Sequence, residues 1–434
     1  MVKGNDRSKV VKMNIILSFA LKAMGIGLSF LTLPLTVHYL TNIEYGVWVT
    51  LFSIMNWINV LDIGIGLGMR NKLAEAVAID DKYSIRMYMA TGFFSMAAIG
   101  VTLLIIFLLG IHDVPMQRVF NTDAISETEL FNATLCTGIF IIVSFVLGLI
   151  TQVYYAYQRA AMNGAMSVLQ GTIMLISVYA LTKSGTHSLV YFVFAFGISM
   201  LLSKLIFITI FFAKHADTMP RWSNVRWDKL KSITSMGIQF FIIQICTIFG
   251  FGFSDVLITQ LVGPEFVRTY DVIFKIFNVS VMVQGLILTP LWSAYTEAYA
   301  QHDFRWIKTI FKKTIKITAF IIVCMLIVSI FIDNLIYLWL HLYFEYSIWL
   351  IIGMIIYHSI SLLAGCFCMV LNGIGRLRLQ MYAWIVSAGL VIPVSWYMTQ
   401  VLKLGNVGII WTLVISLSVL MLMLPIDVWR LFHC

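Results

Sequence analysis

Three lysines fall within long apolar segments of the chain, where a charge is expensive. They are Lys22, Lys204 and Lys275. An ionisable side chain in the hydrocarbon core of a bilayer costs roughly 2.5 to 3.5 kcal/mol, so it needs a partner or a function. Lys204 lies near the middle of its segment, with no acidic residue within two helical turns. We expect Lys204 either to face a water-filled cavity, where it would attract an anion, or to donate hydrogen bonds to carbonyl groups of neighbouring helices.

A polar stripe follows one face of the first apolar segment. Its residues are spaced by three or four positions, which places them on one side of a helix; they are Ser18, Lys22, Gly25, Ser29, Thr32 and Thr36. Two interpretations are open. The stripe either borders a cavity lined by Lys22 and Ser29, or its small residues allow close helix packing while Lys22 extends to the membrane surface.

The same spacing recurs in the second half of the chain, at Asp271, Lys275, Asn278, Met282, Gly285 and Thr289. Asp271 and Lys275 stand one helical turn apart, so they can neutralise one another without any ligand, or they can line a substrate cavity together with Asn278. Asp255 lies at a similar depth and is a second candidate partner for Lys275. Asp255 and His358 are also candidates for coupling to a proton or sodium gradient, although a mid-membrane histidine is more often a packed residue.

Composition identifies the chain as an integral membrane protein. Hydrophobic residues make up 60% of it, charged residues 11%, and the mean hydropathy is +0.93. An ordinary soluble domain has about a quarter charged residues. Apolar runs of about twenty residues indicate helices and exclude a barrel of short strands. The six cysteines fall mostly inside these runs, so neither a disulfide framework nor a metal site is expected.

Charged or turn-rich breaks divide the chain into twelve predicted membrane helices. They lie near 14–38, 46–66, 88–110, 131–154, 164–183, 189–213, 235–262, 267–291, 315–339, 347–371, 381–402 and 407–429. We therefore predict an N-terminal lobe at 1–213, a basic linker at 214–234 and a C-terminal lobe at 235–434. No loop is long enough to form a soluble catalytic domain.

The positions of lysine and arginine predict the orientation. On one side the short loops hold only Arg118, Lys183, Arg268 and Lys403; apart from the three lysines within segments, the other basic residues flank the opposite side. The positive-inside rule places that side, with both termini, in the cytoplasm. The net charge of +9 thus indicates membrane topology rather than nucleic-acid binding.

A stretch of the first half recurs in the second half. Residues 40–45 match residues 261–266, and the acidic and small residues between Glu75 and Asp81 recur 222 positions later, between Glu297 and Asp303. Two matching blocks at nearly one offset indicate a duplication. Because both halves begin in the cytoplasm, they are predicted to be parallel repeats.

The cytoplasmic ends of the two halves carry opposite charges. The glycine-rich stretch 62–68 is predicted to be a cytoplasmic hinge, followed by a short amphipathic segment. In an outward-open state the two sets are expected to meet as a closed gate: Asp62, Arg70 and Glu75 would face Glu297, Arg376 and Arg378.

Short motifs give the chain a resemblance to a known family. They are Leu-x-x-x-Glu-Tyr-Gly at 40–46, Leu-Asp-Ile-Gly at 61–64, Gly-Pro-Glu at 263–265 and Thr-Pro-Leu at 289–291. With these motifs the chain resembles the polysaccharide transporter branch of the multidrug/oligosaccharidyl-lipid/polysaccharide (MOP) exporter superfamily, and in particular the bacterial O-antigen flippases.

The resemblance implies an all-α fold of two six-helix lobes arranged in a V. It implies that the protein moves an undecaprenyl-pyrophosphate-linked oligosaccharide from the cytoplasmic to the periplasmic leaflet of the bacterial inner membrane, by alternating access. The expected partners are this lipid-linked oligosaccharide, membrane lipids, a polysaccharide polymerase and a chain-length regulator. No cofactor is expected beyond a proton or sodium gradient.

Two alternatives stay open. An ion-coupled multidrug/cation antiporter of the same superfamily would share the architecture, but such proteins typically place a carboxylate in the first lobe, where this chain has Lys22. A membrane polymerase or ligase would be an enzyme, and these usually carry a sizeable external loop with several arginines. Only Arg118 is available here, so a transporter is expected rather than an enzyme.

Overall fold

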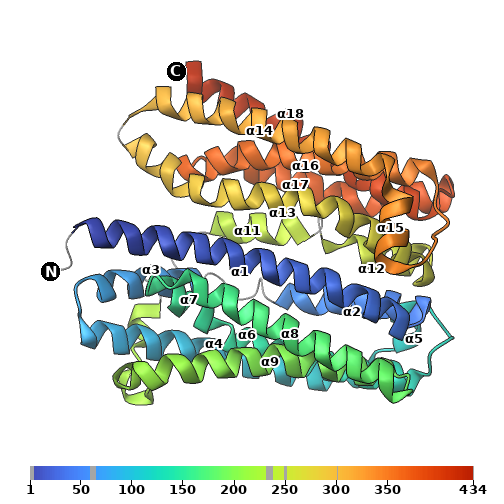
Figure 1. The fold of residues 1–434 in the computed structure, drawn as a ribbon, viewed down its shortest axis with the longest axis horizontal. Coiled ribbons are helices and arrows are strands. Elements are labelled where there is room, and N and C mark those ends of the chain that lie inside the picture. Colours follow the sequence, from blue (N-terminus) through green and yellow to red (C-terminus); the bar gives the residue numbers. More distant parts are fainter. Residues whose placement is uncertain (1–3, 59–64, 231–237, 249–251, 301, 434) are drawn as a thin grey trace. The chain divides into compact units, whose positions relative to one another are not determined.

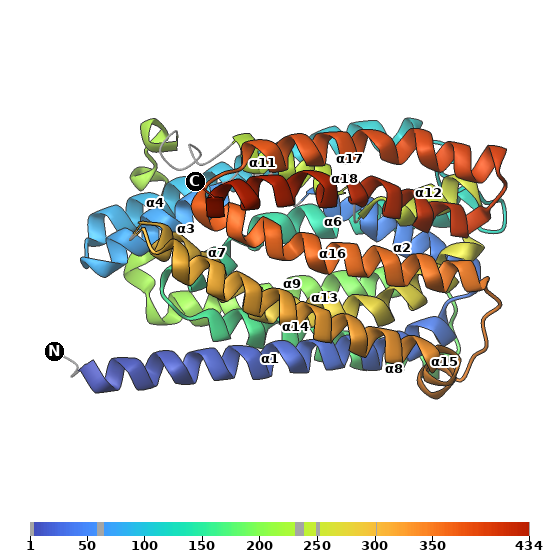
Figure 2. The same cartoon turned by 90° about the horizontal axis from the view of Figure 1, so that it is seen from above.

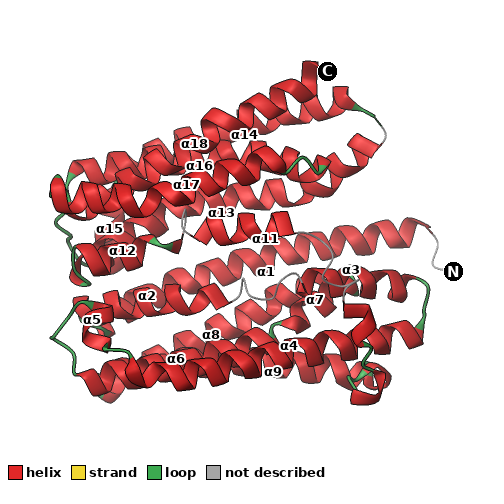
Figure 3. Ribbon diagram, turned by 180° about the vertical axis from the view of Figure 1, so that it is seen from behind, coloured by secondary structure: helices red, strands yellow, loops and turns green. Residues whose placement is uncertain are grey.

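The computed structural model describes residues 4–58, 65–230, 238–248, 252–300 and 302–433, and over these residues it consists of helices and loops (Figure 3). Ten of the described helices are long and apolar enough to cross a membrane. The other two predicted spans, 46–66 and 235–262, each include residues outside the described ranges. Their described parts form the helices α2 (Asn42–Asn56), α11 (Ile238–Thr247) and α12 (Ser254–Leu261). The predicted all-α membrane fold is confirmed.

The helices form two compact units. The first comprises residues 1–44 and 54–237, and the second comprises residues 45–53 and 238–434. The middle of α2 therefore packs with the second unit, although it precedes most of the first unit in the sequence. The predicted lobes follow chain order and therefore do not assign residues 45–53 to the second unit.

The first unit is built around a pair of long helices and a bundle (Figures 1 and 2). α1 (Gly4–Tyr39) packs along α8 (Ala160–Ser184), where a Cβ atom on Gly164 would lie 2.8 Å from Leu21 and one on Gly171 would lie 3.1 Å from Leu28. These glycines let the two helices approach closely. The remaining helices are α3 (Ile65–Ala78), α4 (Lys82–Gly110), α5 (Met116–Phe120), α6 (Glu127–Leu147), α7 (Leu149–Ala156) and α9 (Leu189–Lys214).

The second unit is centred on α16 (Ile348–Ile374), which packs against both α13 (Glu265–Ala300) and α18 (Gly405–His433). The helices α14 (Phe304–Ile330) and α17 (Arg378–Trp396) complete the bundle, and α15 (Ile332–Leu340) follows α14. In α2 the residues from Tyr45 to Leu51 are buried.

The duplicated stretch folds in the same way in both units. Asp81 caps the start of α4 and Asp303 caps the start of α14 through side-chain bonds to backbone N–H groups. The residue before each cap has a positive φ, 53° at Asp80 and 59° at His302. The N–H of Asp81 donates to the Ala76 carbonyl and that of Asp303 to the Ala298 carbonyl. Each pair is separated by 222 positions, so the sequence repeat corresponds to a repeated turn.

The fourth predicted span, 131–154, is interrupted. α6 ends at Leu147 and α7 begins at Leu149, with Gly148 between them. A Cβ atom at Gly148 would lie 3.1 Å from the Ser144 carbonyl oxygen and 3.5 Å from Lys204 Nζ. The lysine side chain thus lies beside the helix break.

Candidate functional site

Lys204 reaches the break between α6 and α7 within the first unit. Its Nζ donates to the Ser144 carbonyl at 2.8 Å and also to the Ser144 hydroxyl. The same lysine lines a cavity of about 240 Å³, together with Gly66, Met96, Phe145, Gly148, Leu149, Thr151 and Gln152. Lys204 is therefore held by a carbonyl group and also lines a cavity, and its role in attracting an anion stays a prediction.

Among the described residues that line the cavity, Lys204 carries a charge and none is a carboxylate. In the described helices of the first unit the acidic side chains lie near helix ends, as Glu127 and Glu129 do in the first turn of α6. Gln152 Oε1 is buried without a hydrogen-bond partner. A cation beside an unsatisfied amide can take a ligand group that is anionic or that carries hydroxyl groups.

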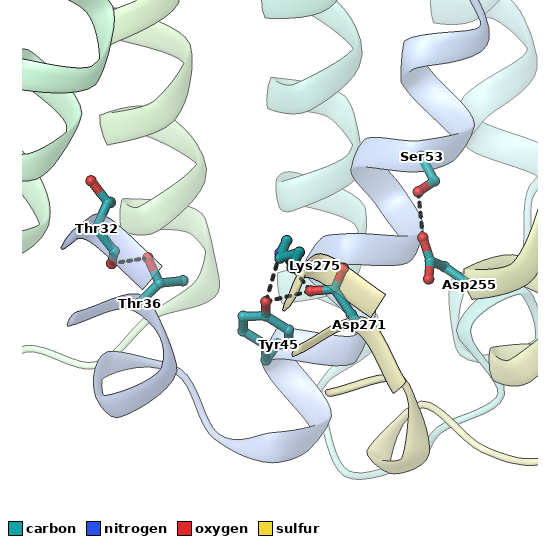
Figure 4. A network of polar contacts seen from close by, with 7 residues as sticks. All are labelled: Thr32, Thr36, Tyr45, Ser53, Asp255, Asp271 and Lys275. Carbon is teal, nitrogen blue, oxygen red and sulfur yellow. Dashed lines mark hydrogen bonds and ion pairs between the residues drawn. The ribbon is translucent and has the colours of Figure 1, made fainter. Parts of the chain in front are cut away.

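The polar stripe of α1 is only partly directed into the protein. Lys22 and Ser29 are exposed, whereas Thr32 and Thr36 are buried. The hydroxyl groups of Ser29, Thr32 and Thr36 donate within their own helix, to the carbonyls of Gly25, Leu28 and Thr32. Figure 4 shows the bond between Thr36 and Thr32. A role for Lys22 and Ser29 in a substrate cavity stays a prediction.

A three-residue polar network lies inside the second unit (Figure 4). Lys275 Nζ and Asp271 Oδ2 form an ion pair at 2.5 Å. Tyr45 from α2 joins it, because its hydroxyl donates to Asp271 at 2.6 Å and accepts from Lys275 at 3.0 Å. The predicted pairing of Asp271 with Lys275 is present, and α2 is fastened to α13 through it.

A second set of polar contacts joins α2 to α12. The Ser53 hydroxyl donates to Asp255 at 2.8 Å, and the hydroxyl groups of Thr50 and Thr259 are 2.6 Å apart. The closest described contacts of Asp255 and Lys275 are therefore with other groups, and their suggested pairing stays a prediction. Lys275 reaches Asp271 one turn away on its own helix, and the described partner of Asp255 is a hydroxyl group.

Tyr45 and Ser53 were not recognised as site residues from the sequence, although Tyr45 belongs to the Glu-Tyr-Gly motif. Each motif residue has a separate contact. Glu44 and Thr41 form a reciprocal capping box at the start of α2. At Gly46 a Cβ atom would lie 1.9 Å from the Pro264 carbonyl oxygen. The sequence similarity between residues 40–45 and 261–266 was the signal that could have pointed to a contact between these two segments.

His358 is buried in an aromatic environment. Its Nδ1 lies 2.8 Å from the Met354 carbonyl, and its ring contacts those of Phe274 and Phe277. Nε2 has no hydrogen-bond partner. This environment suits a neutral imidazole that packs between rings, and a role in ion coupling stays untested. Asn278 is half-buried on α13.

The predicted gate residues are described only in part. Asp62 lies outside the described residues, as does the side chain of Glu297. Glu75 pairs with Lys72 at 2.8 Å, and the guanidinium of Arg70 stacks 4.6 Å from the ring centre of Tyr155. Both contacts lie within the first unit. Arg376 lies between α16 and α17, Arg378 begins α17, and both are exposed. The gate itself stays a prediction. Of the predicted hinge, Ile65 to Gly68 belong to α3.

The comparisons with known proteins point to one group of transporters. No family model matches the sequence. Over 409 aligned residues, 92% of this chain and 91% of the relative, the sequence is 21% identical to a candidate O-antigen transporter of Salmonella typhi.

Two solved structures are similar over nearly their full length. One is an inward-facing multidrug resistance MATE family transporter of the MOP superfamily, with a TM-score of 0.75 and 15% identity over 96% of this chain and 98% of that chain. The other is a MOP superfamily transporter from Pyrococcus furiosus, described as having a binding pocket of reverse polarity; its TM-score is 0.63 at 16% identity, covering 97% of this chain and 96% of that chain. The resemblance predicted from the motifs is confirmed at the level of the fold: this multi-pass membrane protein shares the fold of solved transporters of the MOP superfamily.

Proposed function

We propose that this protein is a flippase that moves an undecaprenyl-pyrophosphate-linked oligosaccharide, such as an O-antigen repeat unit, from the cytoplasmic to the periplasmic leaflet of a bacterial inner membrane. The observation that carries the proposal is the cavity of Lys204. It combines a cation and an unsatisfied buried amide, and the described residues that line it include no carboxylate. The named function of the Salmonella relative supports the same substrate class.

The chemistry of the substrate fits this cavity. A pyrophosphate is anionic, and an ammonium group held by Ser144 is already positioned to receive it. Sugar hydroxyl groups both donate and accept hydrogen bonds, so they can satisfy Gln152 as well as a lysine. The polyprenyl tail can stay in the lipid, and the protein needs to shelter only the head group.

We propose alternating access as the mechanism, in which the two units move and expose the site first to one leaflet and then to the other. The duplication supports this mechanism, because two similar bundles can move as bodies. A proton or sodium gradient is the expected energy source, and Asp255 and His358 are the candidate coupling residues. The resemblance further predicts a polysaccharide polymerase and a chain-length regulator as partners.

A second function is supported by separate observations. Several solved structures with this fold are multidrug transporters, and the second unit contains two carboxylates at α2, those of Asp255 and Asp271. An ion-coupled cation antiporter would use such acids. Asp271 is already paired with Lys275, however, which leaves one carboxylate without an ionic partner in this network.

Complementation separates the two functions. A strain that lacks its O-antigen flippase should regain surface polysaccharide when it expresses this chain with matching glycosyltransferases, whereas its resistance to cationic drugs should not change. Increased drug resistance without any surface polysaccharide would favour the antiporter and would reject the flippase.

A further inference from the structure

The outer face of α14 carries an unusual run of cations. Positions spaced by three or four residues from Arg305 lie on one stripe of the helix. The first four are basic and exposed: Arg305, Lys308, Lys312 and Lys316. Lys313 flanks them, and the sequence from Phe304 to Ile330 contains no acidic residue. The opposite face, with Ile307, Thr314, Thr318, Ile321 and Met325, is buried in the second unit.

The same stripe becomes apolar one turn beyond Lys316. It continues through Phe320, Val323, Ile327 and Ile330, which are 67%, 51%, 53% and 76% exposed. Large exposed apolar side chains on a membrane helix face lipid tails. The change from cations to hydrocarbon between Lys316 and Phe320 therefore marks the level at which phosphate head groups meet the tails. The basic end of α14 and the C-terminal end of α18 lie at the same end of this unit (Figures 1 and 2).

The internal repeat shows what covers the equivalent face in the first unit. At the offset of 222, Lys308, Lys313 and Lys316 correspond to Arg86, Thr91 and Phe94 of α4. The linker after α9 folds over these positions. Arg86 Nε donates to the Asp217 carbonyl at 2.8 Å, Thr91 accepts from the Arg226 N–H at 3.1 Å, and the rings of Phe94 and Trp222 lie 5.0 Å apart.

In the second unit the three equivalent lysines are exposed. The linker thus contacts these positions in the first repeat, where Thr91 is buried, Phe94 is half-buried and Arg86 is exposed, whereas all three positions are exposed lysines in the second repeat. A ligand that binds these cations must be anionic, and because they lie where the apolar stripe begins, it must lie at the membrane surface.

We infer that the basic stripe of α14, formed by Arg305, Lys308, Lys312, Lys313 and Lys316, binds the phosphate head groups of anionic phospholipids. The lysine stems can lie along the helix while their ammonium groups meet phosphates, and the acyl chains lie against Phe320 and Val323. These lipids would contact the outer face of α14 in the second unit, as the linker contacts the equivalent face of α4 in the first. The inference does not depend on the transported substrate.

Lipid binding to the full-length protein tests this inference. The protein in mild detergent is titrated with phosphatidylglycerol or with phosphatidylcholine of the same acyl chains, and bound lipids are counted by native mass spectrometry. The combined variant Lys312→Gln, Lys313→Gln, Lys316→Gln should weaken phosphatidylglycerol binding about tenfold or more, since each basic residue near such a surface contributes measurably. Phosphatidylcholine binding should not change.

Two matched variants make the result specific. The combined change Lys312→Arg, Lys313→Arg, Lys316→Arg should bind as the native chain does. The combined change Lys82→Gln, Arg159→Gln, Lys214→Gln removes three exposed cations from the first unit and should have little effect. An equal loss in that control would overturn the inference. So would displacement of phosphatidylglycerol by a much lower concentration of a polyprenyl pyrophosphate, which would assign the stripe to the transported lipid.

Discussion

Lys204 keeps part of its hydrogen-bonding capacity for a ligand. An ammonium group has three N–H donors, and the Ser144 carbonyl and hydroxyl use two of them. The third donor and the charge remain available to the cavity that the side chain lines. Ser144 thus fixes the position of the ammonium group without neutralising it.

We predict that Lys204→Ala lowers export of the lipid-linked saccharide at least tenfold, because the charge that attracts the head group is removed. Lys204→Arg should retain more activity, although its planar fork fits the Ser144 pocket less well. Surface polysaccharide measured in a flippase-deficient strain reports the effect, with protein in the membrane fraction measured alongside. Lys183→Ala, an exposed lysine in the last turn of α8, is the matched control. Normal export by the Lys204→Ala variant would show that Lys204 is not part of the transport site.

Asp271, Lys275 and Tyr45 should behave as one unit. Removing a single charge, as in Lys275→Met, leaves the Asp271 carboxylate without its ionic partner, and we expect it to cost about 1–3 kcal/mol. The double variant Asp271→Asn, Lys275→Met should cost less than the worse single variant. Tyr45→Phe should cost about 1 kcal/mol, because it removes one hydroxyl group from a bonded pair. Thermal unfolding in detergent of the native protein, Asp271→Asn, Lys275→Met and the double variant gives the cycle, and strictly additive losses would show that the pair is not coupled.

At the scale of helices, the contact between α2 and the start of α13 depends on a missing side chain. The Cβ of Gly46→Ala would lie 1.9 Å from the Pro264 carbonyl oxygen, which is backbone and cannot rotate away. We expect the substitution to cost about 1–3 kcal/mol through displacement of α2. Gly389→Ala is the control, since no atom lies within 4 Å of its added Cβ; there alanine should be neutral or slightly stabilising. Equal melting temperatures for the two variants would contradict the close contact.

The turn after α9 should make stability depend on pH. Burial against the rings of Phe211 and Tyr157, with Arg159 nearby, lowers the pKa of His215 below its usual 6.5. The unfolded chain therefore binds a proton at a higher pH than the folded chain, so the folded state loses stability as pH falls through about 6.5. The melting temperature of the native protein should fall more between pH 7.5 and pH 5.5 than that of His215→Phe. A larger fall in the variant would show that the sign is wrong.

Sequence reasoning succeeded where the information was local. The spacing of Asp271 and Lys275 on one helix predicted their ion pair. The repeat identified Asp81 and Asp303 as equivalent positions, and the structure shows that each caps the start of a helix. It failed where a contact depends on how distant segments pack. Nothing in the spacing of Tyr45 connects it to α13, and nothing in the spacing of Lys204 connects it to Ser144 beside the break at Gly148.

At the scale of the whole molecule, residues 45–53 belong to the second unit although the residues on both sides of them belong to the first, and this affects how the two units can move. This segment is fastened to the second unit by Tyr45, Thr50 and Ser53. The chain passes from one unit to the other before Tyr45 and again after Ser53. If the units move as bodies, as we propose, the backbone must bend at these two crossings while the polar contacts of α2 stay intact.

The central claim is that the chain moves an anionic lipid-linked saccharide. The most direct test is reconstitution of the full-length protein into vesicles with a defined undecaprenyl-pyrophosphate-linked oligosaccharide. The fraction of saccharide accessible to an impermeant glycosidase is then followed with time, with and without proton or sodium gradients. We predict that the native chain moves the saccharide between leaflets at least ten times faster than Lys204→Ala does. Gradient-driven transport of a cationic drug with no movement of the saccharide would contradict the account and would identify an antiporter.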